Sequence, residues 1–215
     1  MELNKYIEHT LLKQDATKAD FIKLFEEAKE HKFLGICVNP CYVKLAKENL
    51  EGSEVKLVTV VGFPLGANTT ETKNFETINA VRDGADEIDM VINVTKLKDC
   101  DYDYIVDEIR QIKTACQGHN LKVIIETDLL TKDEIKTACE LCIKGGADFV
   151  KTSTGFVKGG VGAKAEDVKL MYETVKDAGL QVKASGGIRD KEAALAMIEA
   201  GAVRLGTSSG VKIVG

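Results

Sequence analysis

"KVIIETDLLTKDEIKTACELCIKGGADFVKTS" (residues 122–153) decides the fold, because its hydrophobic pattern changes from strand to helix and back. A short β-branched run at each end favours a strand, and the middle favours an amphipathic helix that returns the chain to a parallel strand. The apolar residues that repeat at helical spacing are Ile135, Ala138, Cys139, Cys142 and Ile143. Because the CxxC pair lies within this stripe, we expect it in the core and not at a zinc or redox site.

The same alternation extends over the whole chain. Eight β-branched runs, separated by amphipathic segments, begin near residues 5, 34, 56, 87, 122, 148, 181 and 203. They predict an α/β fold, a single (β/α)8 TIM barrel with an extra short N-terminal segment. No linker divides the chain, so we expect one domain, residues 1–215. A doubly wound open sheet is the alternative, but "GGVGAKAED" (159–167) matches a dinucleotide fingerprint poorly because it follows a loop.

Composition excludes several functional classes. The formal net charge is -5 at pH 7, and no basic run is interleaved with aromatic residues, which argues against nucleic-acid binding. No window approaches the roughly 18 apolar residues of a membrane helix. Because "MELNKYIEHT" (1–10) does not resemble a secretory signal, we expect a cytoplasmic protein without membrane partners. The six cysteines are then expected to be free thiols.

Four charged residues stand at the carboxyl ends of predicted strands, where a barrel places its active site: Asp89, Glu126, Lys151 and Lys183. A lysine inside a barrel loses hydration and feels any second cation nearby, and both effects favour the neutral amine. A neutral amine can attack a carbonyl to form a Schiff base, which acts as an electron sink when a neighbouring C–C bond breaks. The alternative is structural, with each lysine stem packed and its ammonium paired with Asp89 or Glu126.

Two loops after the last two predicted strands indicate a phosphate site. "ASGGIRD" (184–190) and "LGTSSG" (205–210) are rich in glycines and hydroxyl donors, which suit a close approach to an anion. Many barrels bind a substrate phosphate at this place, although each loop alone also fits a turn followed by a helix cap. His9, His31 and His119 show no metal-binding spacing, so we expect no metal.

Motifs along the whole chain then point to one family. They are "IEHTLL" (7–12), "CVNP" (37–40), "VGFPLGANTTETK" (61–73), "EIDMVIN" (87–93), "VIIET" (123–127), "KTSTGF" (151–156), "SGGIRD" (185–190) and "GTSSG" (206–210). In this order they closely resemble the deoxyribose-phosphate aldolase family. The resemblance implies a class I aldolase that reversibly cleaves 2-deoxy-D-ribose 5-phosphate to D-glyceraldehyde 3-phosphate and acetaldehyde, in deoxyribose catabolism.

The same resemblance implies roles for individual residues. Lys151 would form the Schiff base, Lys183 would keep it neutral and help to move protons, and Asp89 would relay protons through water. The residues implied for phosphate binding are Gly155, Gly186, Gly187, Arg189, Gly206, Ser208 and Ser209. The family needs no metal or other cofactor, its partner is a small phosphosugar, and its barrels are commonly homodimers or homotetramers.

The chain departs from the family pattern at three places. Glu8 stands where aspartate is usual, Asp128 stands where cysteine is frequent, and the loop "VKGGVGAKAED" (157–167) is slightly longer. We expect none of them to contact the central triad, and we expect the loop to change Michaelis constants through Lys158 or Lys164. Two other interpretations remain open: a non-catalytic sugar-phosphate sensor, and a different Schiff-base or isomerase barrel.

Overall fold

Eight parallel strands close into a barrel in which each strand pairs with its sequence neighbours and the last pairs with the first. A computed structural model describes all residues, 1–215. The strands are β1 (Ile7–Leu11), β2 (Gly35–Val38), β3 (Lys56–Val61), β4 (Glu87–Val91), β5 (Asn120–Ile124), β6 (Phe149–Lys151), β7 (Gln181–Ser185) and β8 (Ala202–Thr207). The closed barrel confirms the predicted fold and excludes the open sheet.

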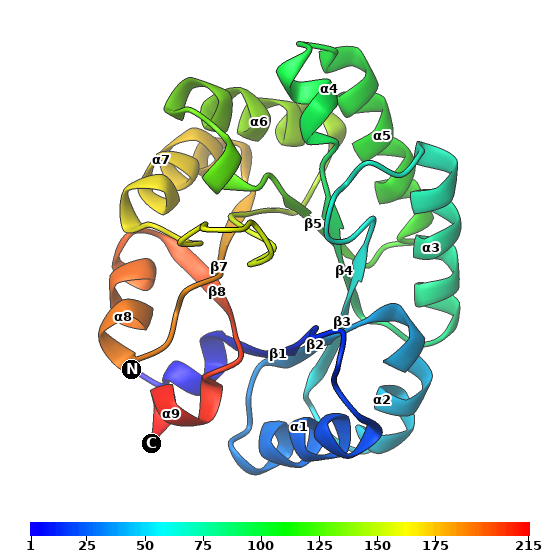
Figure 1. The fold of residues 1–215 in the computed structure, drawn as a ribbon, viewed down its shortest axis with the longest axis vertical. Coiled ribbons are helices and arrows are strands. Elements are labelled where there is room, and N and C mark those ends of the chain that lie inside the picture. Colours follow the sequence, from blue (N-terminus) through cyan, green and yellow to red (C-terminus); the bar gives the residue numbers. More distant parts are fainter.

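The helices surround the strands as an outer ring (Figure 1). They are α1 (Lys18–Glu30), α2 (Val43–Asn49), α3 (Thr70–Arg82), α4 (Val94–Lys98), α5 (Tyr102–Ala115), α6 (Lys132–Gly145), α7 (Ala165–Val175), α8 (Lys191–Glu199) and α9 (Gly210–Val214). Short 3-10 turns η1 (Leu3–Tyr6), η2 (Pro40–Tyr42), η3 (Thr127–Leu129) and η4 (Lys176–Ala178) join them. None of these helices is long and apolar enough to cross a membrane.

Local sequence signals explain where the long helices begin. Thr17 caps α1 and Thr131 caps α6, each in a capping box in which the threonine and an acidic residue three positions later satisfy each other's backbone amides. Cys139 and Cys142 are fully buried on the inner face of α6, as the helical stripe predicts. All six cysteines are free, which confirms the expected thiols.

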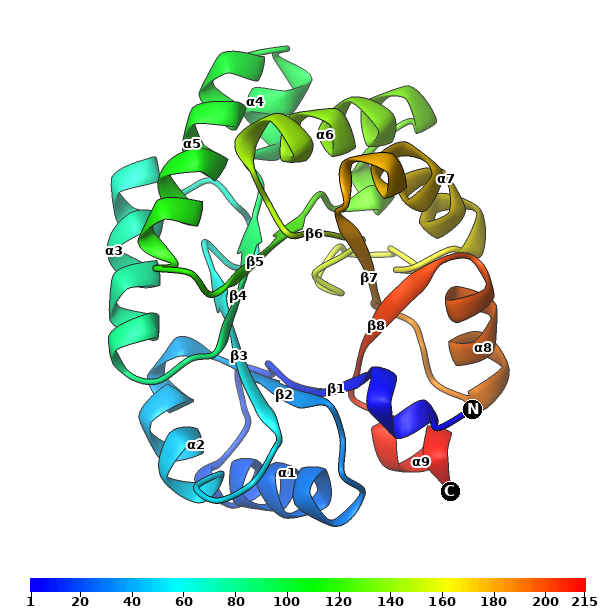
Figure 2. The same ribbon diagram turned by 180° about the vertical axis from the view of Figure 1, so that it is seen from behind.

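The extra N-terminal segment is the turn η1, which precedes β1. Asn4 holds it against the chain between α1 and β2, because its side chain donates to the carbonyl of His31 at 3.1 Å and its own carbonyl accepts from Leu34. Figure 2 shows this blue segment beside the red C-terminal helix α9. The N-terminal and C-terminal segments therefore lie side by side.

The core has two unlike parts. Between the strands and the helices lies one continuous apolar cluster, which includes Phe21, Ile88 and Met171. Inside the barrel, only a small apolar cluster occurs, formed around Cys37, Val58 and Val60. Beside it lie buried charged side chains, with the Phe149 ring next to Lys122 and Arg204, and these charges form the candidate site.

Candidate functional site

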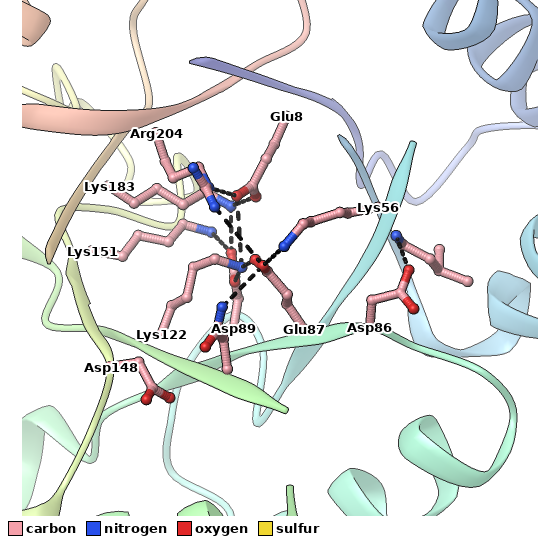
Figure 3. Close-up of polar contacts among 12 residues, drawn as sticks. Glu8, Lys56, Asp86, Glu87, Asp89, Lys122, Asp148, Lys151, Lys183 and Arg204 are labelled. Atoms are coloured by element: carbon pink, nitrogen blue, oxygen red, sulfur yellow. Dashed lines mark hydrogen bonds and ion pairs between the residues drawn. The ribbon is translucent and has the colours of Figure 1, made fainter. Parts of the chain in front are cut away.

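Asp89 lies at the centre of a buried charge cluster (Figure 3). Its Oδ2 accepts hydrogen bonds from the Nζ atoms of Lys151 and Lys183, each at 2.7 Å, and its Oδ1 accepts from Lys122 at 2.9 Å. Lys151 and Lys183 come together because β6 and β7 are neighbours and pair these two residues in register. The structure thus brings the three residues expected to be catalytic into direct contact.

The three lysines differ in how many carboxylates stabilise their charge. Lys122 is within ion-pair distance of Asp89, Glu87 and Glu8, and Lys183 contacts Asp89 and Glu8. Lys151 has Asp89 alone as its ion-pair partner. Of the three ammonium groups, that of Lys151 therefore receives the least compensation for burial.

The cluster shifts the pKa values of its members. Burial alone would raise the pKa of Asp89, but the ammonium groups of Lys122, Lys151 and Lys183 outweigh it and hold that pKa well below its usual range. Burial alone would lower the pKa of Lys183, but the carboxylates of Asp89 and Glu8 outweigh it and raise that pKa. The two carboxylates therefore favour the charged form of Lys183, which lies beside Lys151.

A deeper layer of charges supports this cluster, and sequence reasoning missed it. Glu87 accepts from Lys56 at 3.0 Å and pairs with Lys122 at 2.6 Å, while Arg204 approaches Glu8 and Glu87 at 3.6 and 4.0 Å. Burial alone would raise the pKa of Glu87, but Lys122 and Lys56 lower it to about 2. Strand periodicity could have identified Glu87, because it precedes Asp89 by two residues and so lies on the same face of β4.

The expectation that Glu8 lies apart from the central triad is wrong. Its carboxylate accepts a hydrogen bond from the Nζ of Lys183, because closure of the barrel places β1 beside β8 and Glu8 opposite Gly206. Gly206 in turn leaves room for the lysine, since a Cβ there would lie 3.1 Å from the Cε of Lys183. The departure at position 8 thus acts directly on the cation beside Lys151.

Glu126, the fourth charged residue at a strand end, does not join the lysines. It lies in a left-handed conformation after β5, and its Oε1 accepts from the backbone amide of Thr154 at 3.0 Å while its Oε2 accepts from the Thr154 hydroxyl. Burial raises the pKa of Glu126, and the hydrogen bonds from Thr154 oppose that rise. Its place in the structure is to hold the loop that follows Lys151.

A cavity of about 230 Å³ opens above the cluster, and Lys151 is the only one of the three lysines that lines it. The walls come from the loops after β1, β6, β7 and β8. Six of the seven residues expected to bind phosphate line this cavity: Gly155, Gly186, Gly187, Arg189, Gly206 and Ser208. Ser209 does not line it, and its backbone amide donates to the Thr207 hydroxyl at 2.9 Å.

Hydroxyl groups lock the floor of the cavity. Thr152 donates through Oγ1 to the carbonyl of Ser185 at 2.9 Å, and the Ser185 amide donates back to Thr152 Oγ1 at 2.9 Å. Ser185 Oγ also donates to the carbonyl of Ser153 at 2.5 Å. These bonds fix the segments after β6 and β7 to each other, so the backbone around Lys151 is held rigidly.

Nothing in the site has the composition of a metal centre. No group of three His, Cys, Asp or Glu side chains is arranged to share an ion. Cys37 is buried in the apolar part of the interior, and burial raises the pKa of its thiol to about 11. What the arrangement offers is an amine at the edge of a polar cavity, next to a fixed cation and a shared carboxylate.

Comparison with known proteins agrees with this chemistry. Residues 4–214 match the family model described as DeoC/LacD family aldolase. A deoxyribose-phosphate aldolase of Finegoldia magna is 61% identical over 214 residues, covering 100% of this chain and 99% of that protein. One from Clostridium botulinum (strain Langeland) is 58% identical over 215 residues, covering 100% of both.

Solved structures give the same result. An aldolase called QR15 has a TM-score of 0.93 at 44% identity, covering 99% of this chain and 94% of that one. A tetrameric deoxyribose phosphate aldolase from Aeropyrum pernix has a TM-score of 0.92 at 33% identity, covering 99% of this chain and 89% of that one.

Proposed function

The chain belongs to the DeoC/LacD family of aldolases, and on that premise we propose that it reversibly cleaves 2-deoxy-D-ribose 5-phosphate to D-glyceraldehyde 3-phosphate and acetaldehyde. One observation carries the proposal: Lys151 is the single buried lysine that both lines the cavity and shares the Asp89 carboxylate with a second lysine. A protein that only binds a phosphosugar needs cations at the phosphate, but it does not need an amine at the cavity floor. This interpretation is therefore favoured over the sensor.

The reaction follows from Lys151 acting as a neutral amine. The amine attacks C1 of the open-chain sugar, and loss of water gives an iminium ion. A base removes the proton of the C3 hydroxyl, the C2–C3 bond breaks, and its electron pair moves into the iminium to give an enamine while glyceraldehyde 3-phosphate leaves. Protonation of the enamine at C2 and hydrolysis then release acetaldehyde and restore the lysine.

Lys183 and Asp89 would serve this sequence in different ways. Lys183 would act as a positive charge beside the reacting amine, and Glu8 and Asp89 both stabilise that charge. Asp89 contacts both lysines, so it can pass a proton between them and the reacting atoms through water. The phosphate would be held in the same cavity by Gly155, Gly186, Gly187, Arg189, Gly206 and Ser208. Ser209 would contribute through the backbone of the same loop.

The test is to trap the covalent intermediate. The protein is incubated with acetaldehyde and borohydride and then mapped by peptide mass spectrometry, beside the Lys151→Leu variant and a Lys122→Met variant that keeps the cavity lysine. A single two-carbon adduct on Lys151, absent from Lys151→Leu, is the expected result. A protein that stays unlabelled while it binds the sugar phosphate would instead be a sensor. Turnover of sugars with a 2-hydroxyl, in preference to the 2-deoxy sugar, would indicate a different Schiff-base barrel.

We also propose that residues 1–215 act as one catalytic domain in the cytoplasm and assemble as a homodimer or homotetramer. The tetrameric relative supports assembly, and α3 carries Phe75 and Ile78 one turn apart with exposed fractions of 68% and 44%. Exposed apolar side chains of this size are frequent where protein surfaces meet. Sedimentation of the purified protein would decide the number of subunits.

A further inference from the structure

Asp128 ties two loops of the site together. It lies in η3, directly after β5, and its side chain is only 8% exposed. Its Oδ2 accepts a hydrogen bond at 2.8 Å from the backbone amide of Gly162, in the loop between β6 and α7. The Nζ of Lys164 lies 3.9 Å from Oδ1, so a cation partly offsets the carboxylate.

The loop held by Asp128 lies directly against the expected phosphate loop. The backbone amide of Ala163 donates to the carbonyl of Gly186 at 3.0 Å. Gly162 has a φ of +80°, and a Cβ there would lie 2.7 Å from the Cα of Gly186, so the two backbones touch with no room for a side chain. Figure 1 shows this yellow segment reaching across the barrel beside β7. The position of Gly186 therefore depends on the loop that Asp128 anchors.

We propose that Asp128 is a positioning residue for the phosphate of the substrate, acting through Gly162 and Gly186; this inference rests on the proposed function. The loop from 157 to 164 contains several glycines and gains much freedom when released, so an anchor has to hold it. A carboxylate oxygen accepts an N–H bond strongly, whereas the thiol of a cysteine is a weak acceptor. The two departures noted in the sequence, Asp128 and the longer loop, are thus linked, because the side chain of Asp128 holds that loop in place.

The first experiment measures the anchor without catalysis. Amide hydrogen exchange is followed in the wild type, Asp128→Ala, Asp128→Asn and a control, Asp177→Asn, whose exposed side chain lies in η4 before β7. We expect faster exchange in Asp128→Ala at residues 157–164 and 186–188, and wild-type exchange in Asp128→Asn, whose amide oxygen can still accept from Gly162. Inorganic phosphate should protect residues 186–188 in the wild type and less in Asp128→Ala. Equal exchange in all four proteins would overturn the proposal.

The second experiment separates phosphate binding from chemistry. Loss of a hydrogen bond to a charged group should raise the KM of Asp128→Ala for 2-deoxy-D-ribose 5-phosphate about tenfold, with kcat nearly unchanged. Its kcat/KM for 2-deoxy-D-ribose, which lacks the phosphate, should match the wild type, and Asp128→Asn should restore the KM. An equal loss with both sugars, or a loss confined to kcat, would refute a role at the phosphate. If the wild type cleaves neither sugar, the proposed function fails, and the exchange experiment with phosphate decides this inference alone.

Discussion

Replacement of Lys73 by methionine should destabilise the barrel more than any surface change. Lys73 on α3 and Glu108 on α5 are fully buried, and their Nζ and Oε1 atoms are 2.8 Å apart. Lys73 also donates to the carbonyl of Val91 at 2.9 Å, at the end of the strand that carries Asp89. Removing one partner of a buried pair costs about 3 to 5 kcal/mol, because the other charge stays buried alone. The free energy of unfolding should fall by about 4 kcal/mol, a large part of the 5 to 15 kcal/mol typical of a domain.

The effect should depend on pH in a defined direction. Burial raises the pKa of Glu108, and Lys73 opposes that rise, so the variant should have a still higher folded-state pKa. A carboxyl group whose folded pKa exceeds its unfolded value of about 4.3 contributes its full stability only below that value, and loses it as pH rises through the folded pKa. The stability deficit of Lys73→Met relative to wild type should therefore be smaller near pH 5 than near pH 8.

Urea unfolding followed by far-UV circular dichroism is the assay, because the chain has no tryptophan. With a slope of about 3 kcal/mol per M urea, the midpoint should fall by about 1.3 M. In the Lys73→Met/Glu108→Leu double variant no charge is left buried, so it should be more stable than Lys73→Met by about 2 kcal/mol. Additive losses, or a deficit that does not change with pH, would show that the pair is not coupled as described.

Three further predictions concern other groups. Acidification should reduce the free energy of unfolding less in Glu87→Gln than in the wild type. Wild-type Glu87 stabilises the fold by about 3 kcal/mol above its unfolded pKa, and this stabilisation disappears as pH falls towards its folded pKa of about 2. Acid titrations that coincide for both proteins would contradict this. In native protein only the exposed Cys41 and Cys100 should react with iodoacetamide, with all six cysteines reacting in denaturant, as counted by intact mass; rapid native labelling of more than two would disagree. Glu126→Gln should loosen the loop at Thr154 and raise KM more than it lowers kcat, since only one of two accepting oxygens remains; steady-state kinetics equal to the parent would remove Glu126 from the loop's support.

The strands could be predicted closely because their hydrophobic runs are local. The run predicted from residue 56 coincides with β3, Lys56–Val61. The run predicted from 148 is longer than β6, Phe149–Lys151, and just beyond this strand the Thr152 side chain adds two hydrogen bonds to the backbone of Ser185. The run predicted from 5 begins late, at Ile7, because Leu3–Tyr6 forms a 3-10 turn.

Lys151, Lys183 and Asp89 could be singled out from sequence because they lie on predicted strands near the ends that line a barrel's site, but the other partners of these lysines could not. Glu8 and Lys183 are 175 residues apart and meet only because the barrel closes. Asp128 could not be matched with its partner either, because Gly162 lies 34 residues further on, in a loop without a regular sequence pattern. A motif identifies the amine, whereas the number of carboxylates around each lysine depends on strand register and on closure.

The depth of the charge cluster has a consequence for ionic strength. Asp89, Lys122 and Lys183 are fully buried and Lys151 is 4% exposed, whereas Arg189 and Ser208 at the cavity mouth are exposed. Dissolved ions screen charges in solvent over about 8 Å at physiological salt and act far less on buried pairs. Added salt should therefore leave turnover of a phosphate-free sugar unchanged while it weakens binding of the phosphorylated one. A salt titration would then separate the residues proposed for the chemistry from those proposed to bind the phosphate.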